Sequence, residues 1–253
     1  MRLKDKLAVV TGGASGFGMG IAKIFAREGA HVVIADIQQE LADKQIADIK
    51  NNGGSAEFFH LDVTNFEQAK NLVALIEERN SSIDIWVANA GLGQRPSALE
   101  DTNDDEYMRQ FDVNVKGVFY NCKAILPHFK ARKAGNIIIT ASGIALRPRP
   151  NLVIYGATKG AVLNLAKGLA IEVAGDNIRV NALCPAVGDT PMLAEFMGGV
   201  ETQEEKEKWR QALPLGRLIR PEDMGEAALY LADDKASSRV TGMTFPVDSG
   251  RTV

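Results

Sequence analysis

The sequence has few of the residues from which metal sites and disulfides are built, with 2 cysteines and 3 histidines among 253 residues. Cys122 and Cys184 lie far apart without paired spacing, so we expect two ordinary half-buried thiols rather than a disulfide or metal ligands. His31, His60 and His128 are equally scattered, and each is interpreted as a satisfied or solvated side chain. No metal site is therefore expected.

The sequence also lacks an excess of positive charge and a long hydrophobic run. Its 29 basic residues are outnumbered by 32 acidic ones. No net positive field is available to attract nucleic acid or anionic lipid, so neither is expected as a partner. The apolar run after the charged residues 1–6 is only about five residues long, too short for a signal-peptide core or a membrane span. We therefore expect a cytoplasmic protein.

Short apolar runs rich in β-branched residues alternate with longer amphipathic stretches, which is typical of a parallel sheet wrapped by helices. Strands are expected at 7–10, 31–35, 56–61, 83–88, 136–140, 178–183 and 243–246. Helices are expected at 19–28, 38–50, 66–79, 104–131, 155–173 and 221–232. The pattern predicts an α/β, Rossmann-like, doubly wound fold of about seven parallel strands with helices on both faces. Neither a linker nor a repeat divides the chain, so residues 1–253 are expected to form a single domain.

A glycine-rich turn follows the first predicted strand and leads into the first predicted helix. It runs from Thr11 to Gly18 and reads TGGASGFG. Glycines let the backbone approach a ligand, and the N–H groups at a helix start are free to bind phosphate. Many strand-to-helix loops need glycine only for a positive φ angle, so the turn alone is weak evidence. With the residues that follow, it predicts a nucleotide-binding site.

Asp36 closes the second predicted strand, 18 positions after Gly18. A carboxylate at this place accepts hydrogen bonds from the ribose hydroxyls of adenosine and would repel a 2′-phosphate. Ser15 and Ile37, the neighbours able to supply a basic group for that phosphate, are uncharged. The expected cofactor is therefore NAD rather than NADP.

The turn resembles the cofactor turn of the short-chain dehydrogenase/reductase family, Thr-Gly-x-x-x-Gly-x-Gly, and the resemblance spans about residues 3–250. Asp62 and Val63 match the family's adenine-side pair. Residues 89–91 match its Asn-Asn-Ala-Gly motif, with Ala88 in place of the first asparagine. The resemblance implies cofactor contacts at Gly12, Ser15, Gly16, Phe17, Gly18, Asp36, Asp62, Val63, Asn89, Ala90 and Gly91.

Tyr155 and Lys159 are the catalytic candidates, because a spacing of four on a helix places the phenol and the ammonium on one face. Taken alone, Tyr-x-x-x-Lys is common and usually structural. Here Ser142 lies 13 residues before Tyr155, at the end of the fifth predicted strand, and Asn114 matches the family's helical asparagine. The four residues follow the family's order on the expected elements and predict a catalytic set.

Hydride transfer needs an acid or base at the substrate oxygen whose pKa is brought toward neutrality. The phenol of a free tyrosine, with a pKa near roughly 10, ionises too weakly. The Lys159 cation and the positive nicotinamide are expected to favour the phenolate, so that Tyr155 takes the alcohol proton as hydride leaves. By resemblance, Lys159 also holds the nicotinamide ribose, Ser142 bonds the substrate oxygen, and Asn114 steadies a water that connects Lys159 to solvent.

The loop after the sixth predicted strand, residues 185–192, resembles the family's Pro-Gly loop, which holds the nicotinamide carboxamide. Ala186 replaces the usual glycine, so Val187 and Thr190 are the expected cofactor contacts. Residues 190–211 form an irregular insertion that is expected to cover the substrate, and its charge run is interpreted as a solvated helix face. In this cover segment, the apolar side chains either line the pocket or simply pack an amphipathic helix: Met192, Leu193, Phe196 and Met197.

Arg147 and Arg149, between Ser142 and Tyr155, are candidates for pairing with an anionic substrate group, and Arg95 is a similar candidate. The alternative is that these arginines are solvated or lie at a subunit contact. The Tyr155 helix also carries residues at spacings that allow a partner helix to approach closely, and the family is commonly tetrameric. A homotetramer is expected, with these residues on the shared face: Gly160, Ala161, Asn164 and Gly168.

The leading functional hypothesis is an NAD-dependent oxidoreductase that moves a hydride between nicotinamide and a secondary or benzylic alcohol or ketone. A 3-oxoacyl-carrier-protein reductase is the nearest alternative, and Asp36 argues against it because that enzyme usually uses NADPH. A non-catalytic dinucleotide-binding regulatory protein is a third hypothesis, although it has no need of all four catalytic candidates. An epimerase or lyase on the same scaffold remains open.

Overall fold

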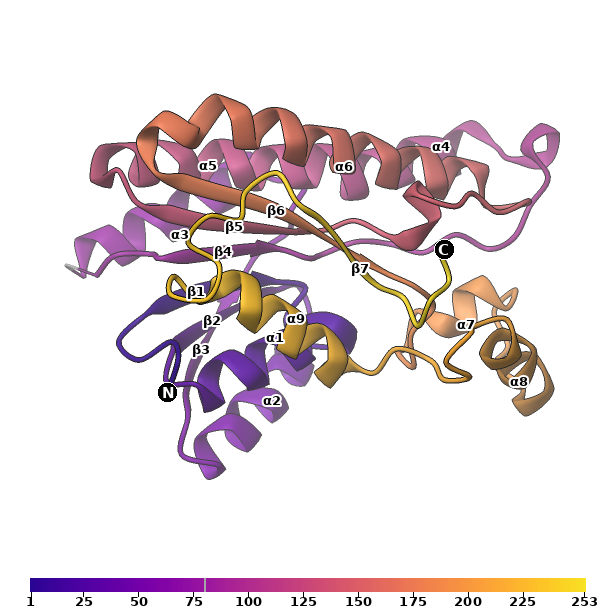
Figure 1. The fold of residues 1–253 in the computed structure, drawn as a ribbon, viewed down its shortest axis with the longest axis horizontal. Coiled ribbons are helices and arrows are strands. Elements are labelled where there is room, and N and C mark those ends of the chain that lie inside the picture. The colour runs from indigo at the N-terminus through magenta and orange to yellow at the C-terminus, as the bar shows by residue number, and fades with distance from the viewer. Residues whose placement is uncertain (80) are drawn as a thin grey trace.

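The computed structural model describes residues 1–79 and 81–253. Seven strands form one sheet in the order β3-β2-β1-β4-β5-β6-β7 (Figure 1), and every neighbouring pair is parallel. The strands are β1 (Leu7–Thr11), β2 (His31–Asp36), β3 (Ser55–His60), β4 (Ile85–Ala88), β5 (Gly135–Thr140), β6 (Ile178–Pro185) and β7 (Thr244–Val247). This arrangement confirms the predicted doubly wound α/β fold.

Helices cover both faces of the sheet (Figure 1). On one face lie α1 (Gly16–Arg27), α2 (Gln39–Asn51) and α9 (Pro221–Ala232). On the other lie α3 (Phe66–Glu78), α4 (Asp104–Phe111), α5 (Gly117–Arg132) and α6 (Val153–Val173). Two short helices, α7 (Leu193–Phe196) and α8 (Gln203–Gln211), stand at the end of the molecule near the carboxyl terminus.

The central strands are apolar on both sides, which is why they read as continuous apolar runs in the sequence. In β4, Trp86 and Ala88 enter the core beneath α3, α5 and α6. Ile85 and Val87 enter the opposite core, beneath α1 and α9. Because successive side chains of a strand point to opposite faces, one strand supplies both cores and holds the two helical layers together.

The predicted helix at 104–131 is wrong in one respect, because it is not continuous. It consists of α4, a π-helical turn at Asp112–Lys116 and α5. A π-helical turn adds a residue to the helical repeat, so it changes which side chains face inward. Here it brings Asn114 into the interior, where the side chain is fully buried. The apolar spacing of the sequence carries no signal for this extra residue.

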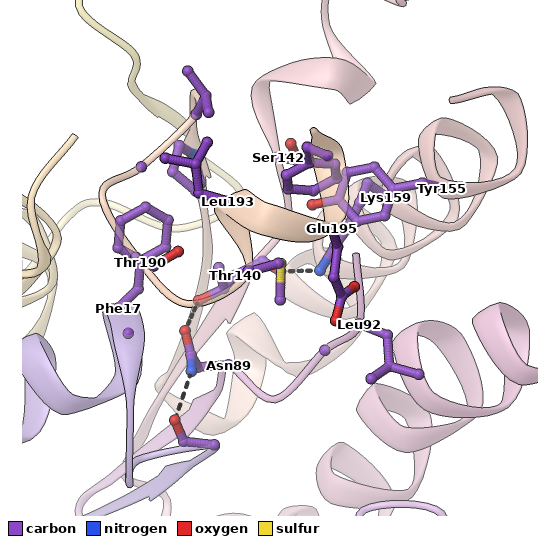
Figure 2. A pocket seen from close by; sticks show the side chains of 18 of the residues that line it. Phe17, Asn89, Leu92, Thr140, Ser142, Tyr155, Lys159, Thr190, Leu193 and Glu195 are labelled. Carbon is purple, nitrogen blue, oxygen red and sulfur yellow. Dashed lines mark hydrogen bonds between the residues drawn. The ribbon is translucent and has the colours of Figure 1, made fainter. Parts of the chain in front are cut away.

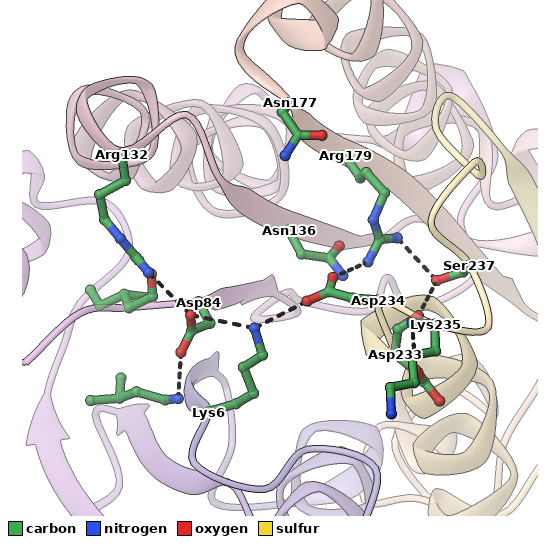
Figure 3. A network of polar contacts seen from close by, with 12 residues as sticks. Lys6, Asp84, Arg132, Asn136, Asn177, Arg179, Asp233, Asp234, Lys235 and Ser237 are labelled. Carbon is green, nitrogen blue, oxygen red and sulfur yellow. Dashed lines mark hydrogen bonds and ion pairs between the residues drawn. The ribbon is translucent and has the colours of Figure 1, made fainter.

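Ion pairs cover the edge of the sheet at which the strands begin (Figure 3). Lys6 and Arg179 both contact the Asp234 carboxylate, at 3.0 and 3.1 Å. Arg132 contacts Asp84 at 3.2 Å, and Asp84 also accepts a hydrogen bond from the Leu7 backbone N–H. Because Lys6, Arg132 and Arg179 each have an acidic partner, we interpret this edge as a structural closure.

The carboxyl ends of the strands meet at the opposite edge of the sheet. The strand order reverses between β1 and β4, and in open α/β sheets a ligand crevice forms at such a reversal. The loops after β1, β4, β5 and β6 all open here, and α7 and α8 stand beside them. Among the described residues, no helix combines the length and apolarity needed to cross a bilayer.

Candidate active site

A cavity of about 460 Å³ lies at this carboxyl edge and collects most of the residues predicted from the sequence. Figure 2 shows Ser142, Tyr155, Lys159 and Glu195 gathered on one side of it, with Phe17 and Thr190 on the other. The predicted residues that line it are Gly12, Ser15, Gly16, Phe17, Asp36, Asp62, Val63, Asn89, Ala90, Gly91, Ser142, Tyr155, Lys159, Val187 and Thr190. Two predicted residues, Gly18 and Asn114, lie behind the lining.

The turn between β1 and α1 leaves room for a ligand at the start of the helix. Gly12 has a φ of +63°, and a Cβ atom there would stand 2.8 Å from the Ala90 Cα. A Cβ on Gly18 would stand 2.1 Å from the Gly12 carbonyl oxygen, so Gly18 acts by letting the turn fold back on the helix. The Ser15 side chain does not cap α1, and the first turn of α1 has no acidic residue. The free N–H groups and the helix dipole therefore favour an anionic phosphate.

Asp36 and Asp62 stand at one end of the cavity. The Asp36 carboxylate accepts hydrogen bonds from the backbone N–H groups of Ala14 and Gln38, both at 3.0 Å, and it is fixed at the end of β2. Asp62 accepts from the backbone N–H and the hydroxyl of Thr64. The fixed Asp36 carboxylate suits a ribose diol and disfavours a phosphate on the ribose 2′-oxygen.

Asn89 ties together the ends of three strands. Its side-chain Nδ2 donates to the carbonyl oxygens of Thr11 and Gly12, at 3.1 and 3.3 Å, and its Oδ1 accepts from the Thr140 hydroxyl at 3.0 Å (Figure 2). Both ends of the amide are therefore engaged by protein groups. Asn89 lines the cavity, and its contacts hold the glycine-rich turn in register with β4 and β5.

Tyr155 and Lys159 lie one helical turn apart on α6 and face the cavity, as the spacing predicted. They are only 7% and 4% exposed. The Lys159 Nζ donates to the Thr140 carbonyl oxygen at 3.0 Å and lies 5.8 Å from the centre of the Tyr155 ring. The phenol and the ammonium thus share one buried wall of the cavity.

Burial dominates the ionisation of both groups. It raises the pKa of Tyr155 to about 12, which the nearby Glu195 carboxylate supports and a hydrogen bond from Ser142 opposes. Burial also lowers the pKa of Lys159 to about 8, because the charged ammonium loses its water. The protein alone therefore does not bring the phenol toward neutrality, and the expected shift depends on the positive charge of a bound oxidised nicotinamide.

Asn114 lies behind the cavity wall, where its whole side chain is occupied. Its Oδ1 accepts from the Leu92 N–H at 2.8 Å, and its Nδ2 donates to the Leu92 carbonyl at 3.1 Å and to Gln110 at 2.8 Å. It also donates to the Thr158 hydroxyl at 3.3 Å. Asn114 therefore links the π-helical turn to the loop after β4 and to α6, and its expected hold on a water remains a prediction.

The apolar side chains of the cover segment, for which the sequence allowed either pocket lining or helix packing, divide between these two roles. Met192, Leu193 and Phe196 line the cavity, and the Phe196 ring lies 5.2 Å from the Tyr155 ring, centre to centre. Met197 instead packs beside Leu193, Leu213 and Leu218. The charge run lies largely on α8, which has no buried residue, as expected of a solvated helix face.

The arginine candidates divide between two cavities. Arg147 and Arg149 line the large cavity, whereas Arg95 lines a neighbouring one among Asp101, Asp105 and Glu106.

Within the described residues, no group of three or more histidine, cysteine or acidic side chains is placed to hold a metal ion.

Several polar or aromatic residues of the site were not predicted from the sequence. Gln94 accepts a hydrogen bond from the Tyr155 N–H at 2.8 Å, and the Thr140 carbonyl holds Lys159. Glu195, Trp209 and Arg251 line the cavity. Glu195 and Trp209 belong to the predicted cover segment but were not singled out in it, and the other three lie in a loop, at a strand end and in the carboxyl-terminal tail.

Comparisons with known proteins agree with this geometry. A family described as enoyl-(acyl carrier protein) reductase matches residues 12–252. A 4-formylbenzenesulfonate dehydrogenase of Comamonas testosteroni is 38% identical over the full length of both chains, and a cyclopentanol dehydrogenase of a Comamonas species is 36% identical over 99% of this chain and 98% of that one. The crystal structure of a 3-ketoacyl-(acyl-carrier-protein) reductase from Brucella melitensis complexed with NADH has a TM-score of 0.90 and 39% identity, covering 99% of this chain and 100% of that one. The chain therefore belongs to the short-chain dehydrogenase/reductase family of oxidoreductases.

Proposed function

We propose that the protein is an NAD-dependent dehydrogenase or reductase that moves a hydride between nicotinamide and a secondary or benzylic alcohol or ketone. The observation that carries the proposal is the convergence of Ser142, Tyr155 and Lys159 on the same cavity as the glycine-rich turn. A regulatory dinucleotide-binding protein needs the turn but has no use for a buried phenol and ammonium beside it.

The choice of NAD rests on the Asp36 end of the cavity. The fixed Asp36 carboxylate favours ribose hydroxyls, and the exposed Ile37 beside it supplies no charge for a 2′-phosphate. Asp62 would lie on the adenine side. The N–H groups at the start of α1 and the turn around Gly12 would hold the pyrophosphate. Val187 and Thr190 would hold the nicotinamide end, with Phe17 beside Thr190.

Bound oxidised nicotinamide supplies the hydride acceptor and a positive charge. During oxidation, the Tyr155 Oη takes the hydroxyl proton of the alcohol, and the hydrogen on the carbon that carries the hydroxyl group leaves with its electron pair. The products are the carbonyl compound, the reduced cofactor and one proton. Ser142 would donate a hydrogen bond to the substrate oxygen, and Lys159, held by the Thr140 carbonyl, would stabilise the phenolate. Reduction runs through the same steps in the opposite direction.

The apolar wall from the cover segment supports a substrate with an apolar body. Met192, Leu193 and Phe196 line the cavity next to Tyr155. Two relatives, a 4-formylbenzenesulfonate dehydrogenase and a cyclopentanol dehydrogenase, are named for aromatic or cyclic substrates, which supports a substrate of this kind. The related 3-ketoacyl-(acyl-carrier-protein) reductase complexed with NADH favours a 3-oxoacyl thioester as the second candidate substrate.

The test follows absorbance at 340 nm. Oxidation of benzyl alcohol and of cyclopentanol is measured with NAD or NADP, and reduction of acetoacetyl-pantetheine is measured with NADH. We expect NAD-linked turnover of at least one of the two alcohols and a loss of about 100-fold or more in Tyr155→Phe. Faster turnover of the thioester would favour the second candidate. Tight NADH binding without turnover of any substrate would favour the regulatory protein and contradict the proposal.

We also propose a cytoplasmic homotetramer. Gly160 and Gly168 on α6 have no neighbouring atom within 4 Å of an added Cβ, and Ile171, on the same face, is 82% exposed. An exposed apolar side chain beside small residues is a surface on which a second α6 would pack closely.

A further inference from the structure

Three arginines line the cavity, and Arg251 follows β7, which lies toward the opposite end of the sheet from β2 and Asp36. Arg147 and Arg149 come from the loop before α6, and Arg251 comes from the carboxyl-terminal tail. The Arg147 Nη1 donates to the Arg251 carbonyl oxygen at 2.9 Å, which ties the loop to the tail. Thr252 lies beside Gly143, 3.5 Å from the position of an added Cβ, so the tail reaches the residue next to Ser142.

These arginines lack acidic partners. Within residues 1–79 and 81–253, no ion pair of 4.0 Å or less involves Arg147, Arg149 or Arg251, in contrast to the paired Arg132 and Arg179. The Nη1 of Arg251 is fully buried and has no hydrogen-bond partner among the described residues. Because no protein acceptor offsets the charge at the buried end of this guanidinium, an anion at its accessible edge would be favourable.

The nearby carboxylates are already engaged or lie elsewhere. Asp248 accepts hydrogen bonds from the N–H groups of Gly250 and Thr252, within the tail itself. Glu195 lies beside Gly93, where one carboxylate oxygen stands 2.8 Å from the position of an added Cβ. Partial burial and a neighbouring arginine lower the pKa of Arg149 and of Arg251, and the Asp248 carboxylate opposes this effect at Arg251. The cluster is therefore positive and only partly compensated.

Arg149 also joins the cluster to the apolar wall. Its guanidinium carbon lies 3.6 Å from the centre of the Trp209 ring of α8. Trp209 and Phe196 both line the cavity, so a planar apolar body has aromatic surfaces beside it. The stack leaves the guanidinium edge free to bind a carboxylate in a bidentate manner.

We propose that Arg147, Arg149 and Arg251 form a subsite for an oxyanion carried by the substrate. The substrate is then an alcohol or carbonyl compound with an apolar, preferably aromatic, body and a carboxylate or similar anionic group at the end remote from the reacting carbon. This inference rests on the proposed function for the reaction, but the anion subsite is tested separately from turnover.

The kinetic test compares two alcohols of the same shape, 4-(hydroxymethyl)benzoate and its neutral counterpart 4-(hydroxymethyl)benzamide, with NAD. We expect the wild type to prefer the anion in kcat/KM by about tenfold or more, and Arg251→Gln or Arg149→Gln to remove most of that preference. Arg239→Gln, which removes an exposed arginine elsewhere, serves as the matched control and should keep the preference. Equal use of both alcohols by the wild type would overturn the subsite and leave the proposed function intact.

A binding test needs no turnover. Only Trp86 and Trp209 are present, and Trp86 is fully buried in the core. Benzoate added to the protein with NADH should change the Trp209 emission saturably, benzamide should bind at least about tenfold more weakly, and Arg251→Gln should weaken benzoate binding by a similar factor. Benzoate binding without turnover of any alcohol would reject the proposed function and keep the subsite. An unchanged benzoate affinity in Arg251→Gln and Arg149→Gln would overturn the inference. A raised KM for NAD in these variants would then assign the arginines to the cofactor, and a changed oligomeric mass would assign them to a subunit contact.

Discussion

The ammonium of Lys159 donates a hydrogen bond to the carbonyl oxygen of Thr140, 3.0 Å away at the end of β5. This bond fixes the ammonium beside the Tyr155 ring, where Lys159 is only 4% exposed. A single backbone acceptor does not replace the hydration of a cation, so the pKa of Lys159 falls to about 8. The site therefore holds a charge that the fold by itself disfavours, which is common where a residue serves catalysis.

Lys159→Met should stabilise the protein without cofactor while it removes activity. Below pH 8 the folded protein carries the unfavourable buried charge, whereas in the unfolded chain the ammonium is hydrated. We expect the variant to gain about 1–3 kcal/mol in the free energy of unfolding at pH 7, from about 1.4 kcal/mol per pKa unit less the lost hydrogen bond. Because the unfolded lysine titrates near 10.5, the gain should shrink as pH rises from 8 to 10.5.

Urea denaturation of both proteins at pH 7 and pH 10 measures this difference. Lys167→Met, which removes an exposed lysine of the same helix, is the matched control and should change stability little. A destabilised Lys159→Met at pH 7 would contradict the buried-charge argument.

Glu195→Gln should move the pH profile of alcohol oxidation to lower pH. The Glu195 carboxylate raises the pKa of Tyr155 by disfavouring the phenolate, so the neutral amide should let the base form at lower pH. The measurement is kcat/KM for benzyl alcohol with NAD between pH 6 and 11. Glu204→Gln, on the exposed α8, should leave the profile in place. A shift to higher pH would mean that Glu195 does not act on Tyr155 by its charge.

Asp36→Ala combined with Ile37→Arg should transfer the cofactor preference to NADP. The double change removes the carboxylate that repels a 2′-phosphate and adds a cation at an exposed position beside it. We expect the ratio of kcat/KM for NADP to that for NAD to rise by about 100-fold or more, since a like-charge contact costs several kcal/mol. Ile37→Arg alone, with Asp36 still present, should give a much smaller change. A wild-type protein that already uses both cofactors equally would refute the proposed preference.

Ile171→Glu should break the proposed tetramer. A carboxylate at a position 82% exposed in the single chain costs little there, but burying it between two α6 helices without a partner is unfavourable. Light scattering should give about four times 27.3 kDa for the wild type and a smaller mass for the variant. Val200→Glu in the cover segment, another exposed apolar position, is the control. A wild-type protein that scatters as a monomer would reject the assembly.

Local sequence determined the alternation of strands and helices, the glycine-rich turn and the one-turn spacing of Tyr155 and Lys159. Each depends on residues close together in the chain, whose periodicity or conformational preference can be recognised without knowledge of the tertiary contacts. The strands agree with their predicted bounds to within one or two residues. The apolar alternation did not reveal the π-helical turn around Asn114, because one added residue leaves the surrounding pattern unchanged.

Only the tertiary structure decided how the site is charged and closed. Burial, which no sequence pattern measures, moves the pKa of Tyr155 upward and that of Lys159 downward. The parallel sheet brings four loops to one edge, and chain segments far apart in the sequence then meet, as Arg147 and Arg251 do across 104 positions. Such contacts depend on the packing of whole elements, and for that reason the arginine cluster and its missing counter-charge became visible only in the folded chain.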